Sequence, residues 1–125
     1  LKKHNNKRKK IAKEYNSRLS NLDWIKVPVI KEDSDHVFHQ YSIVLSNKII
    51  RKKFQAYLLR HEIPTMIYYP IPLHKQKAYR IYNKKPLPVS EKISRQIISL
   101  PMHSEMELEQ IIFICDVIKK FKLNG

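Results

Sequence analysis

The stretch IYYPIPLHKQKAY, residues 67–79, places tyrosines, a histidine and lysines around two closely spaced prolines, with Pro64 just upstream. Proline fixes its own φ angle and cannot continue a helix or a sheet ladder, so this density of proline predicts a rigid loop. Tyrosine and histidine side chains on such a loop can donate and accept hydrogen bonds. The stretch is therefore typical either of an edge that binds a polar ligand or of a stiff structural corner.

His36 and His39 have the spacing of half a metal site only if they lie on a helix. In the strand that we predict for residues 36–45, a three-residue step directs the two imidazoles to opposite faces. No second cysteine or acidic cluster supplies further ligands. We therefore expect no metal site.

Cys115 is the only cysteine of the chain. A catalytic cysteine needs an exposed, electropositive setting, whereas Cys115 lies in the apolar run IIFICDVI, which predicts core packing. A chain with one cysteine forms no internal disulfide, which is typical of a reducing compartment and leads us to expect a cytoplasmic location. Carboxylates concentrate in residues 32–35 and near residue 107, where turn formation and the helix dipole explain them, so no acid–base pair is predicted.

The formal net charge of +14 predicts an anionic partner or a strongly solvated surface. About half of this charge lies in residues 1–18. Aromatic residues are not interleaved with these lysines as a base-stacking platform requires, so nucleic-acid binding is an alternative rather than the favoured function. Apolar runs are far shorter than the ~20 residues of a membrane helix, and the single glycine excludes glycine-rich phosphate loops.

The N-terminal half predicts a helix over residues 2–22 followed by two extended segments. The helix has an apolar stripe with three- and four-residue steps, formed by Ile11, Ala12, Tyr15, Leu19 and Leu22. KVPVI is extended because Pro28 excludes a helix interior. After turn residues 32–35, HVFHQYSIVL predicts a strand with one face formed by Val37, His39, Tyr41, Ile43 and Leu45. We expect the two segments to pair as a hairpin.

The C-terminal half predicts a helix capped by Ser46 or Asn47 and stopped by Pro64, then a short strand at TMIYY. A short helix follows from Ser90, with Ile93, Ile97 and Ile98 directed inward. Ser104 and Glu107 have capping-box spacing before a last helix. The buried face of that helix is predicted to contain Leu108, Ile111, Ile112, Cys115 and Ile118. Residues 1–125 thus predict one α+β domain of two layers, a short, mainly antiparallel sheet covered by helices.

Several stretches in this order resemble the C-terminal region of the DegT/DnrJ/StrS-type sugar aminotransferases. They are RKKIAKEY, HVFHQYSIVL, LLRHEIPTMIYYPIPLHKQKAY, LPVSEKISRQIISLPMH and the last predicted helix. YPIPLHKQ and SLPMH at this separation are the most specific of them. The family consists of fold-type-I enzymes that use pyridoxal phosphate on nucleotide-linked keto-sugars, and the resemblance spans essentially all 125 residues.

The resemblance implies that this chain is the small C-terminal domain and that residues 1–22 are the helix connecting it to a large cofactor-binding domain upstream. The family's Schiff-base lysine and the acidic partner of the pyridine nitrogen belong to that large domain. No lysine here has the matching glycine-rich context. We therefore expect no catalytic residue in this chain, no pyridoxal phosphate bound to it alone and no activity of the fragment.

The resemblance also indicates site residues. In the family, the strand before the proline loop commonly carries a His-Tyr pair facing cofactor and sugar, which corresponds to Tyr68 and Tyr69, with Tyr68 replacing the histidine. His74 belongs to the PLH element and is expected to line the mouth of the site. Gln40 and Tyr41 match the HQY element and are expected beneath it. The alternative for Tyr68 and Tyr69 is packing in the domain core.

The intact enzyme that the resemblance implies transfers an amino group, from glutamate as we expect, to a UDP- or dTDP-linked keto-sugar for surface polysaccharide or related sugar biosynthesis. The cofactor carries the electronic work, while the protein orients the reactants. Partners are then the sugar nucleotide and the amino donor, and a homodimer is expected at full length, with no membrane partner. A basic nucleic-acid-binding module and a protein-interaction domain are the alternatives.

Overall fold

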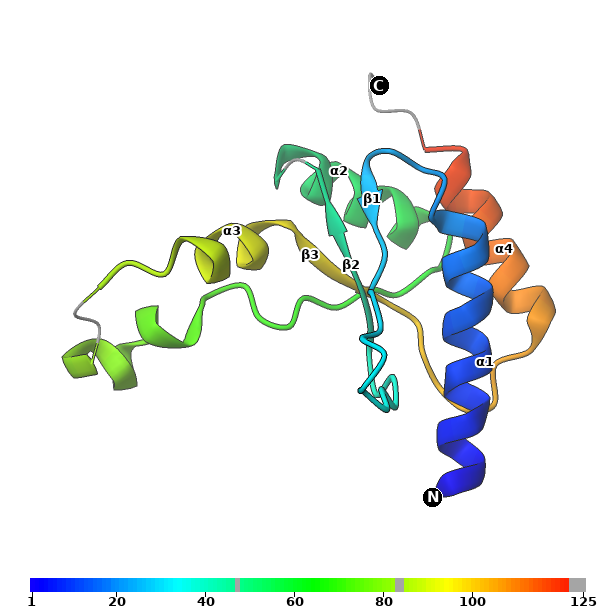
Figure 1. The fold of residues 1–125 in the computed structure, drawn as a ribbon. Helices are drawn as coiled ribbons and strands as arrows, with labels where there is room; N and C mark the ends of the chain where they lie inside the picture. The colour runs from blue at the N-terminus through cyan, green and yellow to red at the C-terminus, as the bar shows by residue number, and fades with distance from the viewer. Residues whose placement is uncertain (47, 83–84, 122–125) are drawn as a thin grey trace.

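The computed structural model describes residues 1–46, 48–82 and 85–121. In chain order the elements are α1 (Lys2–Leu19), β1 (Ile25–Lys26), β2 (Tyr41–Leu45), α2 (Lys48–Arg60), the 3-10 helices η1 (Leu73–Lys75) and η2 (Lys77–Tyr82), α3 (Pro88–Gln96), β3 (Ile97–Leu100) and α4 (Leu108–Lys119). Figure 1 shows α1 and α4 side by side on one flank, and the segment from β3 back through α3 and the 3-10 helices extending away from the other. This is the α+β domain that the sequence predicts.

The strands form one antiparallel sheet in the order β1-β2-β3. Ile43 lies opposite Ile98 in the centre, and the two share a face because paired residues in an antiparallel ladder point the same way. Beyond β3, Met66 and Ser99 exchange both backbone hydrogen bonds, at 3.2 and 2.8 Å. The chain that leads into the proline loop is therefore attached to the outer edge of β3.

The core lies between one face of the sheet and α1, α2 and α4. Tyr41, Ile43 and Leu45 alternate with less buried residues along β2, which is the period of a strand with one covered face. The helices add Ile11, Ala12, Tyr15, Leu19, Phe54, Leu58, Ile111, Ile114, Cys115, Val117 and Ile118. The predicted core position of Cys115 and the predicted stripe from Ile11 to Leu19 are thus confirmed, whereas Leu22 is only partly buried and lies beyond the end of α1.

The strand predicted over residues 36–45 is shorter than expected, because β2 begins only at Tyr41. Phe38, not Val37 or His39, is buried, at 1% exposure, with a positive φ of 48°. Its backbone N–H donates to Nδ1 of His36 at 3.0 Å. A local side-chain bond of this kind offers the backbone an alternative to a sheet ladder, in agreement with the later start of the strand.

The third strand is Ile97–Leu100, so the prediction that Ile97 and Ile98 lie on a helix was wrong. The predicted strand at TMIYY was also wrong, because Met66 forms only an isolated bridge with Ser99 there. The short helix begins with Pro88 at its first turn, where the missing N–H costs nothing, rather than at Ser90. It ends at Gln96, where Arg51 Nη1 from α2 donates to the carbonyls of Ser94 (2.6 Å) and Ile97 (3.2 Å). The β-branched pair that follows then joins β2.

Two helix ends also differ from expectation. The N-cap of α4 is Glu107, whose backbone N–H donates to Oε1 of Gln110 at 2.9 Å, so the capping box starts three residues later than the predicted Ser104 box. After α2, Glu62 takes a left-handed φ of 60°, and the N–H of Ile63 donates to the carbonyl of Leu58. This closing turn ends the helix before Pro64. Of the two predicted caps of α2, Asn47 lies outside the described residues.

Candidate functional site

The proline-rich loop leaves the sheet edge at Met66 and returns to it through α3 (Figure 1). Its two 3-10 helices, η1 and η2, contribute no buried residue. Prolines at 64, 70 and 72 restrict its backbone, so the loop holds a shape although it has no core of its own. It therefore presents its side chains toward α3 rather than packing them inside the domain.

A pocket of about 960 Å³ lies between this loop and α3. Most of its lining is aliphatic or aromatic, with a few hydroxyl, amide and imidazole groups. The lining residues are Tyr68, Tyr69, Ile71, Pro72, Leu73, His74, Gln76, Tyr79, Tyr82, Leu87, Val89, Ser90, Ile93, Ser94 and Ile97. An apolar hollow of roughly 300–1,000 Å³ with a few convergent polar groups is the usual form of a small-ligand site.

The structure brings three of the predicted site residues together in this pocket, namely Tyr68, Tyr69 and His74. A cis peptide bond joins the two tyrosines, whose rings meet edge to face with centroids 5.8 Å apart. Tyr69 is 67% exposed, and neither tyrosine belongs to the buried core. Their hydroxyls are thus available to a ligand in the hollow.

Gln40 and Tyr41 lie outside the pocket. Tyr41 is fully buried at the start of β2, and its hydroxyl donates to Oδ1 of Asn16 at 2.6 Å. Burial raises the pKa of Tyr41 above its usual range, which keeps the phenol protonated as this donation requires. Gln40, directly before it, is only partly exposed. The structure gives Tyr41 a packing role between β2 and α1.

Glu91 is the residue of this region that the sequence analysis missed. Its carboxylate accepts from Lys75 Nζ (2.6 Å) and from the backbone N–H of Leu87 (3.3 Å), and it lies 3.2 Å from His74 Nε2. Hydrogen bonds from Lys75, and to a smaller extent from His74, lower the pKa of Glu91 to about 2. A signal was present, since Glu91 is the only acidic residue between Glu62 and Glu105 in a strongly basic stretch.

The pocket lining contains no lysine or arginine among the residues that the structure describes. The start of α3 is also unsuited to a phosphate, because Pro88 removes one N–H and the Glu91 carboxylate already accepts the N–H of Leu87. Pyridoxal phosphate needs an amine to bond and a cradle for its phosphate, and these lining residues offer neither. They offer instead hydroxyl, amide and imidazole groups that can orient a polar ligand.

Other candidate chemistry finds no support in the described ranges. Within them, no three His, Cys, Asp or Glu side chains gather as metal ligands, and no helix is long and apolar enough to cross a membrane. Cys115 is fully buried, and this burial raises the pKa of its thiol to about 11. Its thiol therefore lacks the exposure and the low pKa of a nucleophile.

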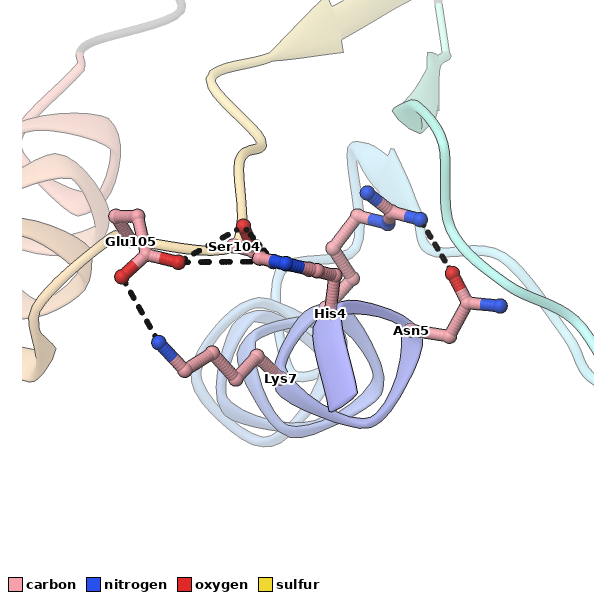
Figure 2. A network of polar contacts seen from close by, with 6 residues as sticks. His4, Asn5, Lys7, Ser104 and Glu105 are labelled. Carbon is pink, nitrogen blue, oxygen red and sulfur yellow. Dashed lines mark hydrogen bonds and ion pairs between the residues drawn. The ribbon is translucent and has the colours of Figure 1, made fainter. Parts of the chain in front are cut away.

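Part of the N-terminal basic block is neutralised within the domain. Lys7 Nζ donates to Oε2 of Glu105 at 2.8 Å, and His4 Nδ1 lies 3.0 Å from the hydroxyl of Ser104 (Figure 2). Lys9 likewise pairs with Asp35 in the segment before β2. These contacts show that α1 uses several of its cations to bind neighbouring segments of the same chain.

Comparison with known proteins gives a consistent result over nearly the whole chain. The model of the DegT/DnrJ/EryC1/StrS aminotransferase family matches residues 1–119. A dTDP-3-amino-3,6-dideoxy-alpha-D-galactopyranose transaminase of Aneurinibacillus thermoaerophilus is 33% identical over 94% of this chain. A UDP-2-acetamido-2-deoxy-3-oxo-D-glucuronate aminotransferase of Pseudomonas aeruginosa is 38% identical over 86% of it.

A solved structure shares the fold. The crystal structure of a DegT DnrJ EryC1 StrS aminotransferase from Brucella abortus superposes with a TM-score of 0.82 at 37% identity, covering 93% of this chain and 30% of that one. The chain likewise spans only 31% and 29% of the length of the two curated relatives.

Proposed function

The chain belongs to the DegT/DnrJ/EryC1/StrS aminotransferase family, and we propose that it is the C-terminal part of an enzyme that transfers an amino group to a keto-sugar nucleotide. The observation that carries this proposal is the pocket in which Tyr68, Tyr69 and His74 converge. The two curated relatives, one named for a dTDP-linked and one for a UDP-linked sugar, support this class of substrate.

In this proposal the pocket binds and orients the sugar part of the substrate. The hydroxyl of Tyr69 and the imidazole of His74 hydrogen-bond to sugar hydroxyls or to the diphosphate, and Tyr68 does the same from the position at which the family resemblance implies a histidine. The aromatic and aliphatic lining excludes water from the bound sugar. A residue here acts on the reaction by fixing substrate geometry rather than by exchanging protons.

The cofactor is proposed to bind outside this chain, because the described residues of the pocket lining offer neither an amine nor a phosphate cradle. When bound, pyridoxal phosphate supplies the electron sink of the amino transfer. We propose that an upstream domain provides its lysine, with residues 1–22 as the connection, and that glutamate is the amino donor. We further propose that the whole enzyme is a cytoplasmic homodimer serving polysaccharide or related sugar biosynthesis.

A direct experiment is to express the full-length protein and incubate it with glutamate and UDP- or dTDP-linked keto-sugars. The proposal expects an amino-sugar nucleotide and 2-oxoglutarate in equal amounts, detected by mass spectrometry. The fragment alone is expected to be inactive. A borohydride-trapped pyridoxal phosphate adduct on one specific lysine of residues 1–125 would contradict that expectation.

Nucleic-acid binding is a second candidate, supported by the net charge of +14. The pairing of Lys7 and Lys9 with carboxylates of the same chain weakens it. A binding measurement on random duplex DNA decides between the two, because a phosphate-driven complex loses roughly a decade or more of affinity between low and moderate salt. Absence of binding at low salt would remove this candidate.

A further inference from the structure

We propose that Glu91 is a positioning residue that holds the proline-rich loop against the start of α3 and so fixes one wall of the pocket. The proposal deepens the proposed function, on which it rests for the identity of the ligand. It concerns a residue that does not itself line the pocket.

The carboxylate of Glu91 joins segments that are separate in the sequence. Oε2 accepts from Lys75 Nζ at 2.6 Å, while Oε1 lies 3.2 Å from His74 Nε2 and 3.3 Å from the backbone nitrogen of Leu87. His74 and Leu87 both line the pocket, although they lie far apart in the sequence. One side chain therefore sets the position of two parts of the wall.

In the part of the chain that the structure describes, the other contacts of the loop are mostly local. Its own hydrogen bonds join near neighbours, such as Lys75 N to Pro72 O, Gln76 N to Leu73 O and Tyr79 N to Gln76 O. Because η1 and η2 contribute no buried residue, apolar burial contributes little to fixing the loop. A bond network from α3 to the loop then has a large influence on loop position.

The setting of Glu91 favours such a role over that of an ordinary surface ion pair. Its side chain is only 17% exposed and that of His74 only 12%, whereas Lys75 is 45% exposed. Charge-assisted hydrogen bonds that are shielded from water are stronger than exposed ones. The carboxylate also accepts a hydrogen bond from the backbone N–H of Leu87. A backbone donor has no rotatable side chain, so this bond fixes the position of the main chain itself.

The chain offers a matched control in Glu105. Like Glu91, it binds a lysine and lies near a histidine, with Lys7 Nζ at 2.8 Å and His4 Nδ1 at 3.7 Å (Figure 2). Its partners belong to α1 and to the segment before α4, and none of them lines the pocket. Substitution of Glu105 therefore measures the general effect of removing a surface carboxylate that binds a lysine.

The test compares Glu91→Gln and Glu105→Gln in the full-length enzyme. Gln keeps the size of the side chain and removes the charge that attracts Lys75. Glu91→Gln is expected to accelerate amide hydrogen exchange in residues 71–82 and 85–87 by about ten-fold, and to raise KM for a keto-sugar nucleotide by about ten-fold with kcat little changed. The rate of the amino-donor half-reaction is expected to stay the same. Glu105→Gln is expected to change none of these.

Unchanged exchange in residues 71–82 and 85–87 of Glu91→Gln would overturn the proposal, and so would faster exchange with an unchanged KM. If Glu91→Gln does not fold, Lys75→Met removes one of the three bonds and is expected to give smaller changes in the same direction. If the wild-type enzyme aminates no keto-sugar, the proposed function fails, and the exchange comparison alone then supports or overturns the role of Glu91 in holding the loop.

Discussion

The ring of Tyr41 stacks on that of Tyr15, with 4.6 Å between the ring centroids and 24° between the ring planes. Each hydroxyl has its own partner, since Tyr41 donates to Asn16 Oδ1 at 2.6 Å and Tyr15 donates to the carbonyl of Pro101 at 2.9 Å. The pair therefore connects β2, α1 and the segment after β3. It explains why both phenols are fully buried.

Replacement of Tyr41 by Phe is expected to destabilise the protein without affecting ligand binding. The variant keeps the stacked ring and loses one hydrogen bond, which is worth about 1 kcal/mol. Thermal unfolding of the full-length protein would show a lower midpoint, while KM for the keto-sugar nucleotide would stay unchanged. An increase in KM would contradict this expectation and would show that Tyr41 contributes to ligand binding.

Replacement of Tyr69 by Phe is expected to have the opposite profile. Tyr69 lines the pocket and is 67% exposed, so the domain does not depend on it for packing. Loss of one hydrogen bond to the substrate would raise KM by about three- to ten-fold and leave the unfolding midpoint unchanged. Equal KM values for the variant and the wild type would remove Tyr69 from the proposed site.

The acid sensitivity of the proline-rich loop follows from Glu91. Its pKa is about 2 in the folded protein, below the ordinary value near 4.5, because Lys75 and His74 bind the carboxylate. A lowered folded-state pKa means that this stabilisation is complete above pH ~4.5 and is lost as the pH falls toward ~2. The difference in loop exchange between wild type and Glu91→Gln, corrected for intrinsic rates, should therefore shrink from pH 5 to pH 3. A difference that grows over this range would contradict the assignment.

Cys115 is expected to be chemically silent in the folded protein. The thiol is fully buried, and burial raises its pKa to about 11, so thiolate is scarce and alkylating reagents cannot reach it. Iodoacetamide should label it only after denaturant is added, as mass spectrometry would detect. Rapid labelling under native conditions would show that α4 detaches from the core.

Glu62 offers a simple stabilising change. It adopts φ of 60° at the end of α2, a conformation that costs a residue with a Cβ roughly 1 kcal/mol and that glycine adopts freely. Glu62→Gly is thus expected to raise the unfolding midpoint, with Glu62→Ala as the control that keeps the Cβ. A midpoint no higher than that of the Ala variant would contradict this reasoning.

Periodicity was sufficient to predict the elements whose burial is one-sided. The stripe from Ile11 to Leu19 in α1 and the alternation from Tyr41 to Leu45 in β2 both have the spacing of their element, and the structure confirms them. The run from Ile97 to Leu100 was misassigned for a physical reason. Its isoleucines also continue the spacing of α3, and the contacts that end that helix come from distant segments, namely Arg51 of α2 and the pairing of Ile97 and Ile98 with β2.

The candidate site was only partly predictable for a similar reason. Tyr68, Tyr69 and His74 are close in sequence, so one short motif identified them together. The other wall of the pocket comes from α3, and its apolar residues, such as Val89 and Ile93, carry no chemical signature. Glu91 acquires its importance only when the loop folds back onto α3, a contact that no local pattern encodes.

The most direct test of the account is a half-reaction with the full-length enzyme loaded with pyridoxamine phosphate. Addition of a UDP- or dTDP-linked keto-sugar is predicted to return the absorbance of the cofactor to that of its pyridoxal form and to release an equivalent of amino-sugar nucleotide. A spectrum that no keto-sugar nucleotide changes, but that a simple 2-oxo acid does change, would contradict the account.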